Sequence, residues 1–334
     1  MSSYGVETSK LKDAKKQLPP MIKLQSFFDP RLPWVLVEDG SLLGFFDWVP
    51  KNLRVGPWSS FAIPTLFIII MALIHLKPSS DEYDTFISFY PELYSKFWWY
   101  NAITFLYMLS LVSFTCVTRT NAVLFTFTIL SWNINMVRHG FNALAPFLSD
   151  GHFILKLNHV LRFPALVSAT ITFFVWNFIL MPYVCILYSH NEEKRVSFLR
   201  WNFSFRLTQV HLCNIFYSIL NTIIAGSREG SKLHPFDSED LWYGLVLIVS
   251  YGLFYVTILD RVGVHIYPIF SPRSKFISLI WAFTILLFYG VFCFWNHIMT
   301  NHVLAFDTLV LVVVIITISM WIVHHLFPHV VKRF

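Results

Sequence analysis

A histidine and a threonine, placed in two apolar stretches of the chain, are the residues best suited to chemistry. The stretch 204–226 is long enough to cross a bilayer, yet it carries His211, Asn214, Ser218 and Asn221. On a helix this spacing puts the four side chains on one narrow face. Polar groups are costly in hydrocarbon, so we expect this face to turn toward other protein or toward a watery pocket.

The stretch 121–137 carries a second stripe of the same kind. Asn121, Thr128, Ser131 and Asn135 recur at helical spacing within it. At 1.5 Å per residue, Thr128 and His211 each lie about 10 Å below the start of their predicted helices. An imidazole and a hydroxyl at matching depth are the minimum for a base-activated alcohol nucleophile. Thr126 is the alternative nucleophile, and Ser131, Asn135, Asn214 and Ser218 are the predicted supporting polar residues.

The same residues also have a simpler interpretation. A threonine in a membrane helix commonly donates to a carbonyl of its own helix or supports helix packing. An intramembrane histidine is rarer, and it can serve either a packing hydrogen bond or a functional role. The spacing by itself leaves both interpretations open.

The composition indicates that membrane-spanning helices position these residues. The chain has 334 residues, of which 56% are hydrophobic and 13% charged, whereas soluble domains have about 25% charged residues. About eight apolar runs are long enough to cross a hydrocarbon core. They are 58–76, 97–118, 121–137, 163–189, 204–226, 241–259, 276–299 and 303–327. We therefore predict an all-α, polytopic membrane helix bundle.

The loop charges predict the orientation of this bundle. Lys and Arg gather in every second connection, as the positive-inside rule requires, so both termini are expected in the cytosol. The predicted organisation is a basic leader over 1–57 with an interfacial segment, a bundle over 58–327 and a short basic tail over 328–334.

Other patterns exclude several function classes. The net charge of +6 comes from cations between the apolar runs, so we expect no nucleic-acid partner. The sequence contains no phosphate-binding loop, no zinc-binding motif and no paired-cysteine metal motif, so we expect no cofactor and no metal. Asn296, His297, Asn301 and His302 are expected at a lumenal helix end, and Asp307 is expected near the start of the last run.

Between about residues 121 and 302, several short sequence motifs occur in an order that resembles one membrane family. The resemblance rests on LRFPALVSATITFFVW, the His211 stretch, HPFDSEDLWYGLVLIVSYGLFYV, the G-x-x-x-Y-P ending at Gly263, Tyr267 and Pro268, and WNHIMTNHV. Thr128, followed by polar residues at Ser131 and Asn135, fits the threonine helix of that family. The chain in this region resembles the androgen-induced-gene family, which includes the androgen-dependent TFPI-regulating protein.

The resemblance implies an activity and residues for it. Characterised members are membrane threonine hydrolases that cleave fatty-acid esters of hydroxy fatty acids. Carried over by position, the nucleophile falls on Thr128, with Thr126 as the alternative, and the base falls on His211. This chain departs from the family where it has Leu207 to Leu212 in place of an Asn-His-x-x-His-Thr run, and where Phe-Thr replaces Leu-Thr on the nucleophile helix.

The leading hypothesis is therefore a lipid-ester hydrolase of the endoplasmic reticulum or another endomembrane, with membrane lipids and a lipid ester as its partners. The alternative is a non-enzymatic polytopic protein, either a small-solute or proton-coupled carrier or a scaffold.

Overall fold

The computed structural model describes residues 59–78, 90–118, 126–149, 151–226, 235–259, 267, 270, 272 and 276–300. The predicted leader over 1–57, the predicted run over 303–327 with Asp307, and the tail over 328–334 lie outside the described residues, as do Asn301 and His302. Within the described ranges every regular element is helical, which confirms the predicted all-α class.

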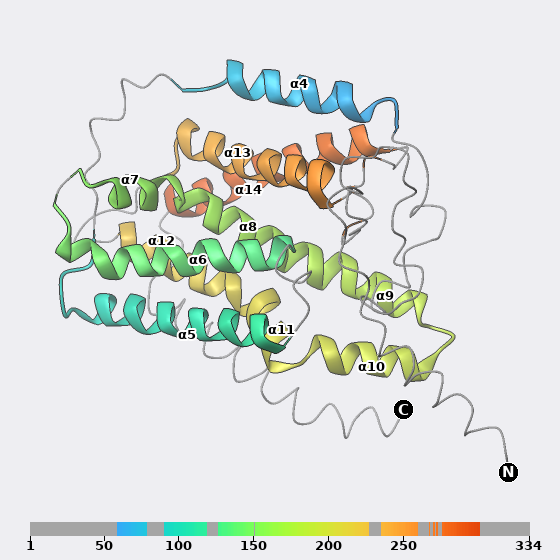
Figure 1. Ribbon diagram of the computed structural model, residues 1–334, viewed down its shortest axis with the longest axis horizontal. Coiled ribbons are helices and arrows are strands. Elements are labelled where there is room, and N and C mark those ends of the chain that lie inside the picture. Colours follow the sequence, from blue (N-terminus) through green and yellow to red (C-terminus); the bar gives the residue numbers. More distant parts are fainter. Residues whose placement is uncertain are drawn as a thin grey trace, which may run out of the picture. The chain divides into compact units, whose positions relative to one another are not determined.

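The described chain runs through α-helices that are interrupted by short 3₁₀ and π segments (Figure 1). In order they are α4 (Ala62–His75), α5 (Lys96–Thr118), α6 (Phe127–Leu144), η4 (Ala145–Phe147), α7 (Phe153–Val160), α8 (Arg162–Phe174), η5 (Val175–Leu180), α9 (Met181–Leu187), α10 (Glu192–Asn202), α11 (Phe205–Thr208), η6 (Gln209–Cys213), α12 (Asn214–Gly226), α13 (Ser238–Phe254), η7 (Tyr255–Leu259) and α14 (Ile277–Thr300).

Four helical stretches of the described part are long and apolar enough to cross a membrane. They are Lys96–Cys116, Phe153–Ile186, Ser238–Leu259 and Ile277–Thr300, and Ala62–His75 is a shorter apolar helix. Large apolar side chains such as Ile103 and Leu106 on α5 and Leu286 on α14 are more than 60% exposed. Outward-facing apolar side chains of this kind suit contact with lipid. The chain is a membrane protein.

The described residues divide into two compact units, which we treat separately. Unit 1 comprises 1–70 and 249–283, and unit 2 comprises 71–248 and 284–334. In unit 1 a small core joins the first part of α4 to η7 and to the start of α14, through Ala62, Val256, Ile277 and Trp281. A hydrogen bond of 2.6 Å between the hydroxyls of Thr65 and Ser278 adds to this contact.

Unit 2 holds both predicted polar stripes. Its centre is α6, which packs against α5, α8 and α12 (Figure 1). The indole of Trp132 is fully buried and donates to the carbonyl of Met108 at 3.2 Å. Trp98 on α5 donates to the carbonyl of Ala143 near the other end of α6, so α5 and α6 are antiparallel.

The start of α6 differs from the predicted run 121–137. Thr126 has extended backbone angles and its hydroxyl accepts from the amide of Ile129 at 3.2 Å, so it is the N-cap and the helix begins at Phe127. The helix then continues to Leu144, beyond the predicted end, and residues 121–125 with Asn121 lie outside the described part. Thr128 therefore lies in the first turn of α6, and the predicted depth of about 10 Å below the helix start is wrong.

Two π-helical segments interrupt the helix that carries the stripe of 204–226 and the neighbouring helix. The segment η5 ends two residues before Pro182, which has no amide hydrogen and disfavours a regular turn before it. The segment η6 contains His211. Segments of this kind occur often at functional sites, and η5 and η6 contact each other.

Candidate functional site

The two predicted polar stripes meet between α6 and α12. Asn135 donates to the side-chain oxygen of Asn214 at 2.8 Å, and the amide of Asn214 donates to the hydroxyl of Ser131 at 2.9 Å. Ser131 and Asn135 are fully buried and Asn214 is nearly so. Helices that must bury polar groups in a membrane protein pair them across the interface, as these three residues do.

The register of this pairing sets which residues lie opposite each other. Ser131 and Asn214 are separated by 83 positions, and Asn221 lies 3.1 Å from the ring of His139, a separation of 82 positions. Partners with a nearly constant separation indicate that α6 and the 205–226 segment run parallel. The same separation of 83 positions links Thr128 to His211, so the two residues lie at one level along these segments.

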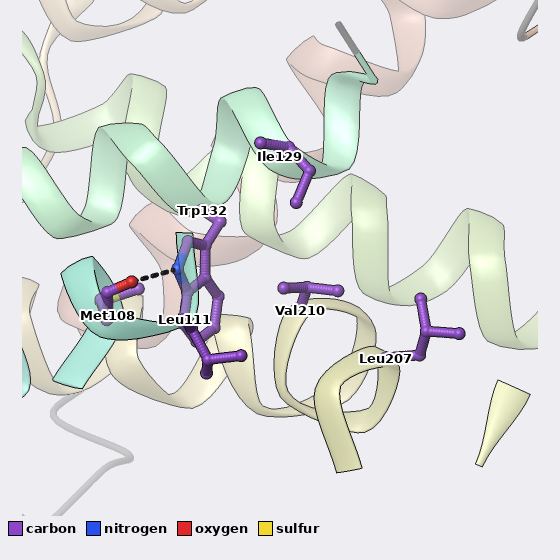
Figure 2. Packing of buried hydrophobic residues seen from close by; sticks show 6 residues of the cluster. All are labelled: Met108, Leu111, Ile129, Trp132, Leu207 and Val210. Atoms are coloured by element: carbon purple, nitrogen blue, oxygen red, sulfur yellow. Dashed lines mark hydrogen bonds between the residues drawn. The ribbon is translucent and has the colours of Figure 1, made fainter. Parts of the chain in front are cut away.

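A buried apolar cluster supports the same alignment. Ile129, next to Thr128, and Val210, next to His211, belong to one cluster with Leu207, Trp132 and Met108. Figure 2 shows Ile129 and Trp132 on α6 above Val210 and Leu207. The first turn of α6 and the segment around His211 thus lie at one level of unit 2.

The ring of His211 contacts Trp176 of η5. The two ring centroids are 4.0 Å apart and the planes are inclined by 31°. His211 is 7% exposed, and its buried Nδ1 atom has no hydrogen-bond partner among the residues that the structure describes. Asn177 donates to the backbone carbonyl of His211 at 3.3 Å. The imidazole is thus held by stacking and by its backbone, while its Nδ1 atom stays free to accept or donate a proton.

The π segment also moves His211 away from the predicted stripe. A regular α-helix would carry His211 and Asn214 on one face, but the wider turn of η6 changes the rotation between them. Asn214 reaches α6, whereas the ring of His211 stacks on the indole of Trp176. In the part of the chain that the structure describes, no hydrogen bond joins this ring to a serine or threonine hydroxyl.

The remaining predicted site residues take different positions. Thr128 is buried at 7% exposure on α6. The hydroxyl of Thr126 accepts the N-cap hydrogen bond of that helix. Ser218 is fully buried on α12, and its hydroxyl has no hydrogen-bond partner.

Two neighbours of His211, Trp176 and Asn177 of η5, were not predicted from the sequence. Thr172, one turn before Trp176, has a buried hydroxyl for which the described residues offer no hydrogen-bond partner. Pro182 is the sequence signal that could have indicated an irregular turn there. The apolar pattern of the run 163–189 could not have indicated it, because that pattern is typical of a regular membrane-spanning helix.

A second buried polar cluster lies further along α6. The Nδ1 atom of His139 lies 2.8 Å from the side-chain oxygen of Asn101, and Asn221 donates to that same oxygen at 2.9 Å. Asn158 of α7 donates to Asn142 at 2.6 Å, and Arg138 donates to Asn158. The predicted runs end at 137 and resume at 163, whereas α6 continues to Leu144 and α7 covers Phe153–Val160. Polar side chains of α5, α7 and α12 form hydrogen bonds with these groups. The helix α6 can therefore extend past residue 137 with its polar groups buried.

An ion pair joins α8 to α13. Arg162 donates from Nη2 and Nε to the carboxylate of Asp240, which is fully buried, and from Nη2 to the carbonyl of Pro235 at 3.1 Å. Asp237 and Asp240 cap the start of α13 reciprocally. Asn296 of α14 accepts from the amide of Phe236. These residues of the HPFDSED motif hold helices together.

No group of three or more His, Cys, Asp or Glu side chains in the described ranges is arranged to hold a metal ion. The chain was also compared with family models, with curated proteins and with solved structures, and it matches none of them. The resemblance to a family therefore stays a prediction from the sequence.

Proposed function

We propose that the chain is an integral-membrane lipid-ester hydrolase in which Thr128 is the nucleophile and His211 is the base. The observation that carries the proposal is the parallel register of α6 and α12. The Ser131–Asn214 hydrogen bond sets this register, and the same separation of 83 positions puts Thr128 and His211 at one level along the two segments. A buried imidazole whose Nδ1 atom has no partner supplies the proton acceptor that such a hydroxyl needs.

The reaction would proceed in two steps. The hydroxyl of Thr128 attacks the ester carbonyl while His211 takes its proton, and the carbon–oxygen bond to the alcohol breaks as His211 returns the proton to that alcohol. Water then attacks the acyl-enzyme, His211 takes a proton from it, and Thr128 regains a proton as the acid leaves. The substrate class suggested by the family resemblance is fatty-acid esters of hydroxy fatty acids.

Asn135 and Asn214 are the proposed donors to the oxyanion. Each amide nitrogen carries two hydrogens, and each uses one of them in the hydrogen bonds between the helices. The second hydrogen of either amide is available to a developing negative charge. Removal of one such donor costs an enzyme about 2.7–4 kcal/mol of transition-state stabilisation.

The proposed topology has about eight spans with both termini in the cytosol, and the proposed compartment is the endoplasmic reticulum or another endomembrane. Basic residues in every second connection support this orientation. The four helices long enough to span support the membrane location itself.

The test is activity-based labelling of the full-length protein in membranes with a fluorophosphonate, alongside hydrolysis of a fatty-acid ester of a hydroxy fatty acid. His211→Ala and Thr128→Ala should each abolish labelling and lower hydrolysis by at least about 100-fold. His190→Ala, at an exposed histidine, and Thr115→Val, at a buried threonine bonded to its own helix, are the matched controls. Labelling that survives in both test variants would refute the proposal.

A second candidate function is a carrier of small polar solutes or protons. It is favoured by the unpartnered polar atoms along the α6–α12 interface, namely Asn135 Oδ1, Ser218 Oγ and Asn221 Oδ1. Such atoms can line a polar path through a membrane bundle. Solute or proton uptake by vesicles containing the purified protein, unchanged in the labelling-deficient variants, would support the carrier over the hydrolase.

A further inference from the structure

The last residue of α10 is connected to the ring of His211 through one aromatic side chain. The side-chain oxygen of Asn202 accepts a hydrogen bond from the indole nitrogen of Trp176 at 2.6 Å, and that indole stacks on the ring of His211 with the centroids 4.0 Å apart. Phe198 and Asn202 are the two buried residues of α10. A buried amide needs hydrogen-bond partners, and Trp176 supplies one of them.

The orientation of the Asn202 amide is fixed on both sides. The indole nitrogen of Trp176 can only donate, so the atom of Asn202 that faces it must be the oxygen. The amide nitrogen of Asn202 then donates to the sulfur of Met181 at 3.1 Å. An inverted amide would place two donors against each other at the indole. The oxygen of Asn202 therefore holds the indole of Trp176 in one rotation.

The stack leaves the nitrogen atoms of His211 available for chemistry. Both nitrogens lie in the plane of the ring, whereas the contact with Trp176 uses the face of the ring. The backbone carbonyl of His211 accepts from Asn177, which restrains the main chain but not the rotation of the side chain. The indole of Trp176 is thus the contact in the described structure that sets the plane of the imidazole.

The segments around His211 provide no carboxylate for this task. A catalytic base is commonly oriented by a third group, which is often a carboxylate. The described segments that pack against η6 are α6, α8, η5, α11 and α12, and their sequences contain no Asp and no Glu. Glu192 and Glu193 of α10 are exposed and lie at the opposite end of that helix from Asn202. The orienting contact on His211 is therefore aromatic.

We propose that Asn202 is a positioning residue for His211 and acts through the indole of Trp176. The proposal rests on the proposed function, because it assigns the group that orients the base of that reaction. The hydrogen bond fixes the indole, and the indole fixes the plane of the imidazole, so the edge of the imidazole points in one direction during proton transfer. The face of an indole also attracts a cation, which favours the imidazolium that forms when His211 takes a proton.

Nuclear magnetic resonance of the full-length protein in nanodiscs tests this link without a substrate. With isotope-labelled tryptophan and histidine, the signals of Trp176 and His211 are assigned by their loss in Trp176→Phe and His211→Gln. Asn202→Leu keeps the approximate size of the side chain and removes the acceptor. The indole N–H proton of Trp176 should then shift upfield, and the ring protons of His211 should lose the upfield shift that the indole face gives them. Asn202→Asp keeps an acceptor oxygen and should keep both signals near their wild-type positions.

Ester hydrolysis gives the second readout. Asn202→Leu should lower kcat by about 10- to 100-fold and change KM by less than about twofold, because the base is misoriented while contacts with the substrate are unchanged. Asn202→Asp should recover most of kcat. Trp176→Phe removes the other half of the hydrogen bond and should lower kcat as far as Asn202→Leu does. Ser197→Ala, at an exposed position of α10, is the matched control and should have the kcat, KM and signals of the wild type.

Several results would overturn the role of Asn202. They are wild-type signals of Trp176 and His211 in a folded Asn202→Leu, a wild-type kcat in Asn202→Leu or in Trp176→Phe, and equal losses of kcat in Asn202→Leu and Asn202→Asp. The last result would show that Asn202 serves packing alone.

Failure of the proposed hydrolase gives a different result. The wild type would then cleave no ester, while both signals would still shift in Asn202→Leu and stay in place in Asn202→Asp. That outcome would refute the hydrolase and support the control of the His211 ring by Asn202.

Discussion

The side-chain amide of Asn135 donates to the side-chain oxygen of Asn214 at 2.8 Å, and this hydrogen bond ties α6 to α12 across a fully buried interface. The amide of Asn214 extends the contact to Ser131. Because the three side chains come from the two stripes that were recognised by spacing, their contact fixes the relative rotation and register of the two helices.

The first prediction concerns the strength of this contact. In a double-mutant cycle with Asn135→Ala and Asn214→Ala, we expect a coupling energy of about 0.6 to 1.7 kcal/mol in favour of the pair. Thermal unfolding of the purified variants in detergent measures it. The pair Asn135 and Asn177, which no hydrogen bond joins in the described structure, is the control and should be additive within about 0.5 kcal/mol.

The second prediction separates the two candidate nucleophiles. Thr126→Ala removes an N-cap and should lower stability by about 0.5–2 kcal/mol, because the amide of Ile129 loses its acceptor. Thr126→Asp keeps an acceptor at the cap but has no hydroxyl. If Thr128 is the nucleophile, Thr126→Asp should keep both the stability and the fluorophosphonate labelling of the wild type. Loss of labelling in Thr126→Asp at unchanged stability would instead assign the nucleophile to Thr126.

The third prediction concerns the close approach of α8 and α13. A Cβ atom at Gly244 would lie 2.7 Å from two ring atoms of Phe163, so Gly244→Ala should destabilise the protein by about 1–3 kcal/mol. Gly252→Ala is the matched control, since no atom lies within 4 Å of the added group, and it should be neutral or stabilising. Phe163→Leu combined with Gly244→Ala should recover part of the loss. A neutral Gly244→Ala would contradict the close packing of these helices.

The fourth prediction concerns the buried ion pair. Asp240→Asn keeps the shape of the side chain but leaves Arg162 without its counter-charge, at a cost of about 3–5 kcal/mol in the free energy of unfolding. Asp237→Asn, at the same helix start but outside the ion pair, should cost less than half as much. Denaturation followed by circular dichroism in detergent gives both values. Equal effects of the two substitutions would show that capping, and not the ion pair, holds α13.

The composition of the chain determined the class of the fold. The chain has long apolar runs and few charges, which is typical of a membrane protein. In lipid the backbone must satisfy its own hydrogen bonds, and a helix does so within one segment. The described elements are helical, as this argument predicts. Helical spacing likewise indicated that Ser131, Asn135 and Asn214 face inward, because the cost of exposing an amide to hydrocarbon does not depend on which helix lies opposite.

Only the tertiary structure decided what those polar residues meet. The π segment at 209–213 turned His211 toward Trp176, and Asn101 and Asn158 pair with His139 and Arg138 in a part of α6 that extends beyond the predicted run 121–137. Periodicity in a single helix carries no information about register between helices or about a local change in helical pitch. The register between helices and the local helical pitch depend on how buried polar groups pair across an interface. Each such group needs a partner that lies far away in the sequence.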